Sequence, residues 1–412
     1  MLLKKRLKKK PALKLFIAAW LWGGALSVSA AVQELTATFR PDPQNPMNNK
    51  FTNTTPQSGI CPWHIPATCM RLGIFSIRTY DIVFRSNGPL LLNPGGPTDP
   101  RKGVMFKVPS EWRSLEVLSD TGDRETVEVR IAGIGNRVDV GSPASIHSWG
   151  PRTWQFAPAP CQSSGYATGT GTYMLWFWLV PQAAGACNLT HIREVPSMYY
   201  STFEYAYELR TPNPLKMQTG TYRGALSYSV GPYKDFDWGD IMIPNDDTLV
   251  FNFTLDVTHI LKVEIPPGGN RVELVPQGGW QSWVQQGRRP TRLFRDQTFN
   301  LWTSSRFNMQ LQCQFPSGNT CAMQSETGQR VPLDISVSLP YGIGDESRQA
   351  VVRRPLLLDG SSTREFTPTH YVDRRPGTLH FEVPASEVVE MFKPGASSKY
   401  SGTATVIWDS EV

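Results

Sequence analysis

The end of the chain alternates between apolar and polar residues. Between residues 400 and 408 one set of alternate positions is mainly apolar, and the polar residues 401, 403 and 405 fall between them. One face of a strand would carry the apolar side chains, which are Tyr400, Ala404, Val406 and Trp408. This period of two is typical of a half-buried β-strand, so we expect a strand here.

A second copy of this pattern lies upstream, in residues 221–230. Tyr222 and Gly224 match Tyr400 and Gly402, and each copy comes after a stretch that contains proline. The repeat predicts two tandem β-domains, each with this strand near its end. The alternative is that the two domains are unrelated, because a Tyr-x-Gly motif is short.

The two copies differ in the length of chain that comes after them. After the first copy, residues 249–257 alternate cleanly and predict one more strand, whereas only four residues come after Trp408. If the two domains share a fold, the second lacks its final strand and has an open edge. A strand donated by another chain would close that edge. If the domains are unrelated, the second is complete.

The rest of the sequence also favours an all-β chain. Short β-branched and aromatic runs predict strands, and glycine and proline, 34 of each, mark the turns between them. We expect loops at 87–100 and 157–171 and one short helix at 386–392. The strands predicted before residue 210 are 35–39, 74–85, 104–108, 115–118, 126–131, 172–180 and 203–209.

The alternation of residues 249–257 resumes after a short break with Leu261, Val263 and Ile265. No flexible linker separates the two runs, so we expect a stiff, extended rod with domains at 32–257 and 258–412. The alternative is one long bent strand inside a single domain, which the length of the chain disfavours.

Residues 1–31 have the pattern of a secretory signal peptide. Seven lysines and arginines precede an apolar run at 15–28, and small residues for cleavage come next at Ala30 and Ala31. The whole chain has a net charge of +6, and removal of this segment would leave −1. A nearly neutral mature chain gives no reason to expect nucleic acid as a partner.

Six cysteines in an exported chain indicate disulfides. Pairing of nearest neighbours is our prediction among the fifteen possible connectivities. It gives the pairs Cys61–Cys69, Cys161–Cys187 and Cys313–Cys321. Zinc is the weaker alternative, since no Cys-x-x-Cys occurs and the histidines are scattered.

With these features the chain resembles the minor tip adhesins of class 5 (alternate chaperone–usher) fimbriae, which initiate pilus assembly. The matching features are the Cys61 and Cys69 hairpin, the pair Cys161 and Cys187, the strands at 224–230 and 248–258 that run into 261–266, and the final Tyr400-x-Gly402. They cover most of the mature chain by order and spacing. The chain is longer than these relatives, chiefly in its first domain and at 231–247.

The resemblance implies two immunoglobulin-like β-sandwiches, of which the first is a receptor-binding adhesin domain and the second a pilin domain that lacks its last strand. It also implies four partners: a periplasmic chaperone, the outer-membrane usher, the donor strand of the major pilin subunit, and a host cell-surface receptor such as a glycan. The protein would be exported through the periplasm to the fimbrial tip. We expect the walls of the donor-strand groove to include Leu261, Val263, Ile265, Val406 and Trp408.

The receptor site of the family does not carry over to this sequence. In the family, the receptor surface uses arginines shortly before the first cysteine and after the strand that corresponds to residues 225–230. Here residues 53–60 contain no arginine, and residues 231–234 contain one lysine. Trp176 and Trp178 are more typical of a core than of a sugar site. Our candidate receptor-binding residues come from two expected loops and are Trp149, Arg152, Trp154, Lys234 and Trp238. For the loop that contains Lys234, a solvated loop without a binding role is the alternative.

Catalytic motifs are absent from the sequence. It has no Gly-x-Ser-x-Gly, His-Glu-x-x-His or Walker loop, and we expect no metal and no cofactor. Three other classes of protein stay open as alternatives. They are a non-adhesive structural fimbrial subunit, a secreted carbohydrate-active enzyme with a β-sandwich fold, and a periplasmic chaperone, which should be shorter and complete.

Overall fold

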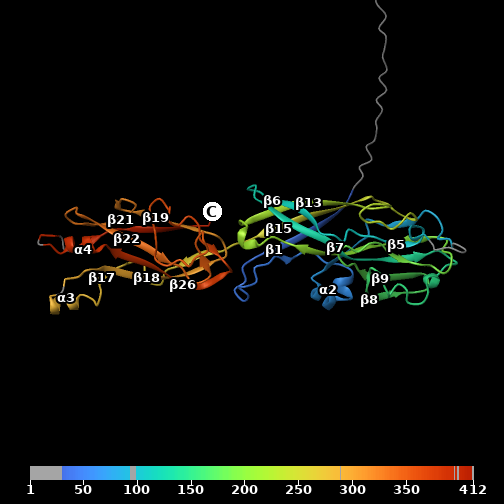
Figure 1. Cartoon of the computed structure of the whole chain (residues 1–412), viewed down its shortest axis with the longest axis horizontal. Coiled ribbons are helices and arrows are strands. Elements are labelled where there is room, and N and C mark those ends of the chain that lie inside the picture. The colour runs from blue at the N-terminus through green and yellow to red at the C-terminus, as the bar shows by residue number, and fades with distance from the viewer. Residues whose placement is uncertain (1–29, 93–98, 288, 394, 397–398, 411–412) are drawn as a thin grey trace, which may run out of the picture.

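A computed structural model describes residues 30–92, 99–287, 289–393, 395–396 and 399–410. Nearly all of the expected signal segment 1–31 lies outside these residues. None of the described helices is long and apolar enough to cross a membrane. The chain is mainly β, which confirms the all-β class, and its sheets form two sets that lie end to end along the long axis (Figure 1). We call residues 30–257 the N-terminal part and residues 258–410 the C-terminal part.

The N-terminal part contains the first fifteen strands. Its largest sheet has the order β14-β4-β11-β7-β6-β13-β15-β1-β2, with β12, β3, β9 and β8 branching from β7, and β10 pairs with β5 separately. The strands are β1 (Ala31–Phe39), β2 (Thr52–Asn53), β3 (Phe75–Thr79), β4 (Phe84–Ser86), β5 (Val104–Phe106), β6 (Arg113–Ser119), β7 (Arg124–Val140), β8 (Gln162–Gly169), β9 (Tyr173–Leu179), β10 (Cys187–Leu189), β11 (Met198–Tyr200), β12 (Phe203–Arg210), β13 (Gly220–Ser229), β14 (Met242–Pro244) and β15 (Thr248–Val257).

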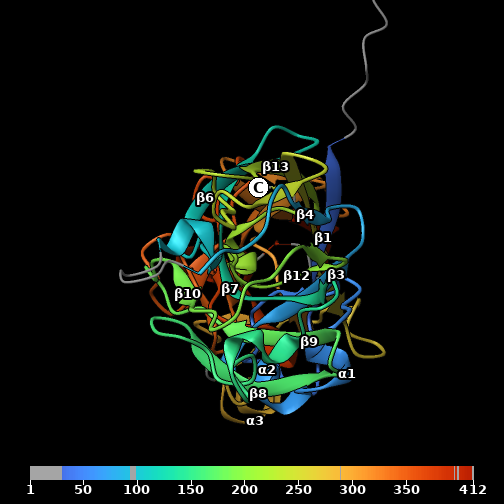
Figure 2. The same ribbon diagram turned by 90° about the vertical axis from the view of Figure 1, so that its right-hand side faces the viewer.

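The helices of this part are short. Two α-helices lie beside β8 and β9 in the end-on view (Figure 2). The helices are α1 (Ile60–Trp63), α2 (Pro66–Leu72) and the 3₁₀ turns η1 (Pro100–Lys102), η2 (Ile146–Trp149) and η3 (Pro214–Lys216).

The C-terminal part has a nine-stranded sheet with the path β16-β18-β26-β22-β21-β20, to which β17, β24 and β27 are added, and two separate pairs, β19 with β28 and β23 with β25. The strands are β16 (Leu261–Glu264), β17 (Val275–Pro276), β18 (Leu293–Thr303), β19 (Asn308–Cys313), β20 (Pro316–Ser317), β21 (Thr320–Ser325), β22 (Arg330–Ser338), β23 (Ile343–Gly344), β24 (Arg354–Pro355), β25 (Thr367–Pro368), β26 (Val372–Val383), β27 (Tyr400–Ser401) and β28 (Ala404–Asp409). The helices are α3 (Gln281–Gln286) and α4 (Ala385–Met391), close to the short helix expected at 386–392.

Each part buries its own apolar cluster. The N-terminal cluster spans residues 31–257, and the C-terminal cluster spans residues 293–388. Trp176 and Trp178 on β9 are 1% and 0% exposed, so they belong to the core as expected. The division into separate domains, and the number of immunoglobulin-like units, stay predictions.

The three disulfides join Cys61 to Cys69, Cys161 to Cys187 and Cys313 to Cys321, which confirms the pairing of nearest neighbours. The Cys61 and Cys69 segment is helical, whereas the sequence suggested a hairpin. Pro66 begins α2 at a position where its lack of an N–H costs nothing, and Gly73 ends the helix in the left-handed conformation.

Three other boundaries differ from expectation. The strand expected at 74–85 is two strands, β3 and β4, and the loop expected at 157–171 contains β8. The strand expected at 126–131 continues as β7 to Val140 through Gly133 and Gly135. A Cβ atom at Gly133 would lie 2.5 Å from the ring of Phe177 on β9, so glycine lets the two strands pack closely.

At the junction of the two parts, three residues separate β15 from β16. The ring of His259 bridges the parts, because its Nε2 lies 3.0 Å from the carbonyl oxygen of Met217 and its Nδ1 lies 3.1 Å from the hydroxyl of Ser304. The backbone N–H of Tyr371 also donates to the carbonyl of Pro46, at 3.2 Å. Direct contacts therefore hold the parts together; the stiffness of the junction stays a prediction.

Candidate functional site

The last strand of the N-terminal part lies between two others. β15 pairs in parallel with β1, from Ala31 opposite Leu249 to Phe39 opposite Val257. Its other edge pairs antiparallel with the whole of β13. Strand β15 thus closes the sheet between the first strand of this part and the strand that carries the Tyr222-x-Gly224 motif.

The C-terminal part has counterparts of both neighbours. β16 is its first strand, as β1 is in the N-terminal part, and β28 comes directly after the repeated Tyr400-x-Gly402 motif. Among the described residues, β16 pairs only with β18, and β28 pairs only with β19. No described strand pairs with the other edge of β16 or β28, and by correspondence with β1 and β13 that is the place that β15 fills in the N-terminal part. We call this position the open strand position.

The side chains at this position are less covered than their counterparts. Tyr228 on β13 is 1% exposed and packs against Phe251 of β15 at 5.2 Å between ring centroids, whereas the matching Val406 on β28 is half-buried. Tyr222 is fully buried, and the matching Tyr400 is half-buried. In the N-terminal part β15 pairs directly with Tyr222 and Tyr228, whereas no described strand pairs with this edge of β28.

The expected groove residues separate into two groups. Leu261, Val263, Val406 and Trp408 are all half-buried and pack against the C-terminal core. The ring of Trp408 contacts Phe299 at a centroid distance of 5.1 Å. Ile265 lies one residue beyond the end of β16 and is 46% exposed, outside this cluster. A donor strand against these residues stays a proposal.

The expected surface position of three tryptophans is wrong. Trp149, Trp154 and Trp238 are 3%, 1% and 1% exposed. Trp149 and Trp154 pack edge to face at 5.2 Å, and Trp238 stacks on Phe84 at 4.9 Å. Their indoles fill the N-terminal core, because a large apolar ring in a loop is stabilised by turning inward.

The loop of residues 231–240 is anchored, which excludes a fully solvated loop. The carboxylate of Asp237 is buried and accepts from the guanidinium of Arg101 at 2.9 Å. The hydrogen bond to Asp237 raises the pKa of Arg101 further above its ordinary value, against the opposing effect of burial. Arg152 and Lys234 are the two predicted receptor-binding residues that lie at the surface.

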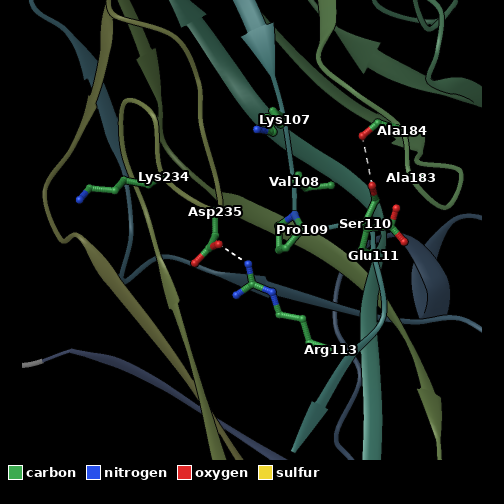
Figure 3. A pocket seen from close by; sticks show the side chains of 10 residues that line it. All are labelled: Lys107, Val108, Pro109, Ser110, Glu111, Arg113, Ala183, Ala184, Lys234 and Asp235. Atoms are coloured by element: carbon green, nitrogen blue, oxygen red, sulfur yellow. Dashed lines mark hydrogen bonds and ion pairs between the residues drawn. The ribbon is translucent and has the colours of Figure 1, made fainter.

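Lys234 lines a cavity of about 240 Å³ in the N-terminal part (Figure 3). The cavity lies between the segment after β5, the start of β6 and the turn at residues 183–184. Its charged lining residues are Lys107, Glu111, Arg113, Lys234 and Asp235.

Two of these charged groups neutralise each other. Arg113 forms an ion pair with Asp235, which also accepts from the backbone N–H of Ser229 at 2.8 Å. Burial would raise the pKa of Asp235, but the bonds from Arg113 and Ser229 outweigh it and hold the pKa below its ordinary value. Within the described part of the chain, Lys107, Lys234 and the carboxylate of Glu111 form no ion pair. The lining thus carries three cationic and two anionic side chains, and this small positive excess favours an anionic group.

The sequence could not identify Lys107 and Arg113 as candidate binding residues, because only the folded sheet brings them into the same cavity as Lys234. The same holds for Trp63 on α1, which is 56% exposed and has the guanidinium of Arg78 at 5.1 Å from its ring centroid. No three His, Cys, Asp or Glu side chains gather as a metal site would require, among the residues described.

No protein-family model and no curated protein match this chain. Its structural neighbours include chains of two chaperone–tip adhesin complexes. One, from a study of CFA/I fimbriae biogenesis, has 10% identity and a TM-score of 0.25 and covers 93% of this chain and 97% of the other. The second, a pre-assembly complex of the archaic chaperone–usher Csu pili of Acinetobacter baumannii, has 10% identity and a TM-score of 0.23, with coverages of 92% and 98%. Since both TM-scores are low, a function for this chain has to be argued from its own geometry.

Proposed function

We propose that the protein is a tip adhesin and assembly initiator of chaperone–usher fimbriae. In this proposal its C-terminal part is a pilin domain, residues 258–412, that accepts a strand from another subunit. The observation that carries the proposal is the open strand position between β16 and β28, at which β15 lies in the N-terminal part.

The N-terminal part also supplies a template for the donor. β15 runs parallel to β1 and antiparallel to β13. A donor in the same arrangement would run parallel to β16 and antiparallel to β28, and its backbone would satisfy the edge of β28 that faces the open strand position. Alternate apolar side chains of the donor would cover Val406 and Trp408 on one wall and Leu261 and Val263 on the other.

The partners follow from this mechanism. A periplasmic chaperone would hold the open position first, and the N-terminal extension of the next subunit would replace it at the outer-membrane usher. Three disulfides fit a protein that is exported to an oxidising compartment. The N-terminal part, whose own strand position is closed by β15, would be the receptor-binding domain, residues 32–257.

For the receptor contact we propose the cavity at Lys107 and Lys234. Both amines lie at the surface, and the neighbouring Arg113 is already held by Asp235. A receptor with a carboxylate, sulfate or phosphate group, such as an acidic glycan, would be recognised there. We propose no catalytic role for this chain.

Thermal unfolding of the mature chain tests the strand-acceptor function. Synthetic peptides from the N-termini of candidate major subunits would be added in excess, and a peptide with its alternate apolar residues changed to aspartate would be the control. We expect one apolar peptide to raise the melting temperature by several degrees and its aspartate version to have no effect. Cooperative melting at high temperature that no peptide changes would refute the proposal.

A further inference from the structure

Helices α3 and α4 lie at the end of the C-terminal part that faces away from the N-terminal part (Figure 1). Apolar side chains on and beside these two helices are exposed or half-buried. The rings of Trp280, Trp283 and Phe392 pack together, with centroids 4.7 Å apart between Trp283 and Phe392 and 6.3 Å apart between Trp280 and Phe392. Each of the two helices also carries an exposed valine, since Val284 on α3 is 79% exposed and Val389 on α4 is 56% exposed. We call this end of the molecule the pole, and we call these five residues the α3–α4 patch.

The composition of α3 is unusual for an exposed helix. Its six residues, Gln281–Gln286, include no charged side chain and include a tryptophan and a valine. Of the described residues at this pole, Phe392 and the buried Val388 of α4 pack with the C-terminal core cluster, and Trp280 and Trp283 do not. The helix therefore rests on Phe392, the residue after α4, and exposes Trp280 and Val284 beside three uncharged glutamines. Exposed apolar side chains without charged neighbours on the same helix are typical of a contact surface.

The direction of the strands connects this patch to the open strand position. β26 begins beside Tyr371, which bonds to Pro46 of the N-terminal part, and ends at Val383, directly before α4. β18 is antiparallel to β26, so β18 begins at the pole and ends at the junction. β17 pairs with the first residues of β18 and therefore lies at the pole. β16 pairs with the last residues of β18 and therefore lies at the junction. The walls of the open position thus run from the junction to the pole.

Both walls lead into the patch at that end. Strand β17 continues along the same edge of β18 as β16 and is followed within five residues by α3, and the segment after α4 leads through β27 into β28. A donor strand parallel to β16 enters at the junction and leaves at the pole. The body of a subunit that donates its N-terminal extension comes after the end of that strand, so it must lie against the pole.

We propose that the α3–α4 patch is the docking surface for the folded body of the donating subunit. In this proposal the body presents an apolar face next to the residues at which its N-terminal extension begins. This inference rests on the proposed strand-acceptor function and adds a second contact to it. The strand fills the open position, while the patch holds the body that carries the strand. Substitutions at the patch should therefore affect the intact donor and leave a peptide unaffected.

The test uses the mature chain with two probes, the donor peptide that raises its melting temperature and the intact subunit from which that peptide comes. The variant is Val284→Asp combined with Val389→Asp, both at exposed positions. The matched control is Val352→Asp, at a residue that is 73% exposed and lies beside β24, away from the pole. We expect the double variant to bind the peptide within about twofold of the wild type and the intact subunit at least tenfold more weakly, with V352D unchanged for both.

Hydrogen exchange gives an independent measurement. We expect protection of residues 280–286 and 385–392 with the intact subunit and none of it with the peptide. Binding of the intact subunit by the double variant at wild-type strength would overturn the proposal. So would protection of these residues by the peptide alone, or a loss of binding to the chaperone in place of the subunit. A wild-type chain that no candidate peptide stabilises would instead refute the strand-acceptor function.

Discussion

Val406→Asp is the sharpest test of the open strand position. Val406 is half-buried on β28, on the face that packs toward the core, and its counterpart Tyr228 is covered by β15. In the free chain the new carboxylate keeps contact with water, so we expect the substitution to cost about 1 kcal/mol of stability. In the complex the donor strand would cover it, and the carboxylate would lose its water without gaining a partner.

The loss of donor affinity has two contributions. A fully buried valine is worth about 1.5–3 kcal/mol, and about half of that is still to be gained at Val406 when the donor binds. Burial of a carboxylate that has no partner costs several kcal/mol more. The sum is about 3–5 kcal/mol, and each 1.4 kcal/mol is a factor of ten, so we expect the dissociation constant to rise by about two to three and a half orders of magnitude.

Thr405→Asp supplies the matched control for this experiment. Thr405 is the neighbouring residue of β28, is exposed, and points to the opposite face. Fluorescence anisotropy of a labelled donor peptide would measure the binding of both variants, and melting of the free proteins would show that each folds. Equal affinities for V406D and T405D would show that Val406 does not face the donor strand and would rule out the open strand position as its binding site.

Four further predictions concern the N-terminal part and the junction. Burial holds the pKa of His259 below 6.5, so at this residue the folded chain binds fewer protons than the unfolded chain, and its contribution to stability falls as the pH drops through 6.5. His259→Ala should therefore weaken this pH dependence of the melting temperature. The same His259 variant loses two hydrogen bonds and should lower the free energy of unfolding by about 1–3 kcal/mol near pH 8, measured by denaturant titration. Replacement of Cys61 and Cys69 by alanine should destabilise the α1–α2 segment by about 2–3 kcal/mol and expose it to limited proteolysis. Trp178→Ala removes a fully buried indole and should cost about 3–5 kcal/mol, which calorimetry would record as a fall in melting temperature of about 10 °C.

Local patterns were sufficient to predict much of the fold. The alternation around Val406 and the run before Val257 predicted β28 and β15 because strand periodicity is a property of neighbouring residues. Disulfide pairing followed from short separations, such as the sequence separation of 8 from Cys313 to Cys321. These features depend on residues that are close in the chain.

The features that the sequence did not predict depend on contacts between distant residues. Trp154 and Trp238 lie in segments rich in turns, and their burial follows from rings on other strands, which local composition does not report. The cavity likewise needs Lys107, Arg113 and Lys234 to meet across two strands and a loop. Such a site becomes visible only when the order of strands in the sheet is known.

The position of β15 has a mechanical consequence. This strand is also the segment that leaves the N-terminal part, and after Val257 it reaches the C-terminal part within three residues. A pull along the long axis would therefore enter the N-terminal part along β15 and load the backbone hydrogen bonds to β1 and β13 together, in shear, over the length of the strand. Bonds loaded in parallel fail together at a high force, whereas a hairpin pulled open from its end breaks one bond at a time. If the proposed adhesin function holds, the strand that closes the sheet is thus also suited to carry tension between a surface bound by the N-terminal part and a fibre attached to the C-terminal part.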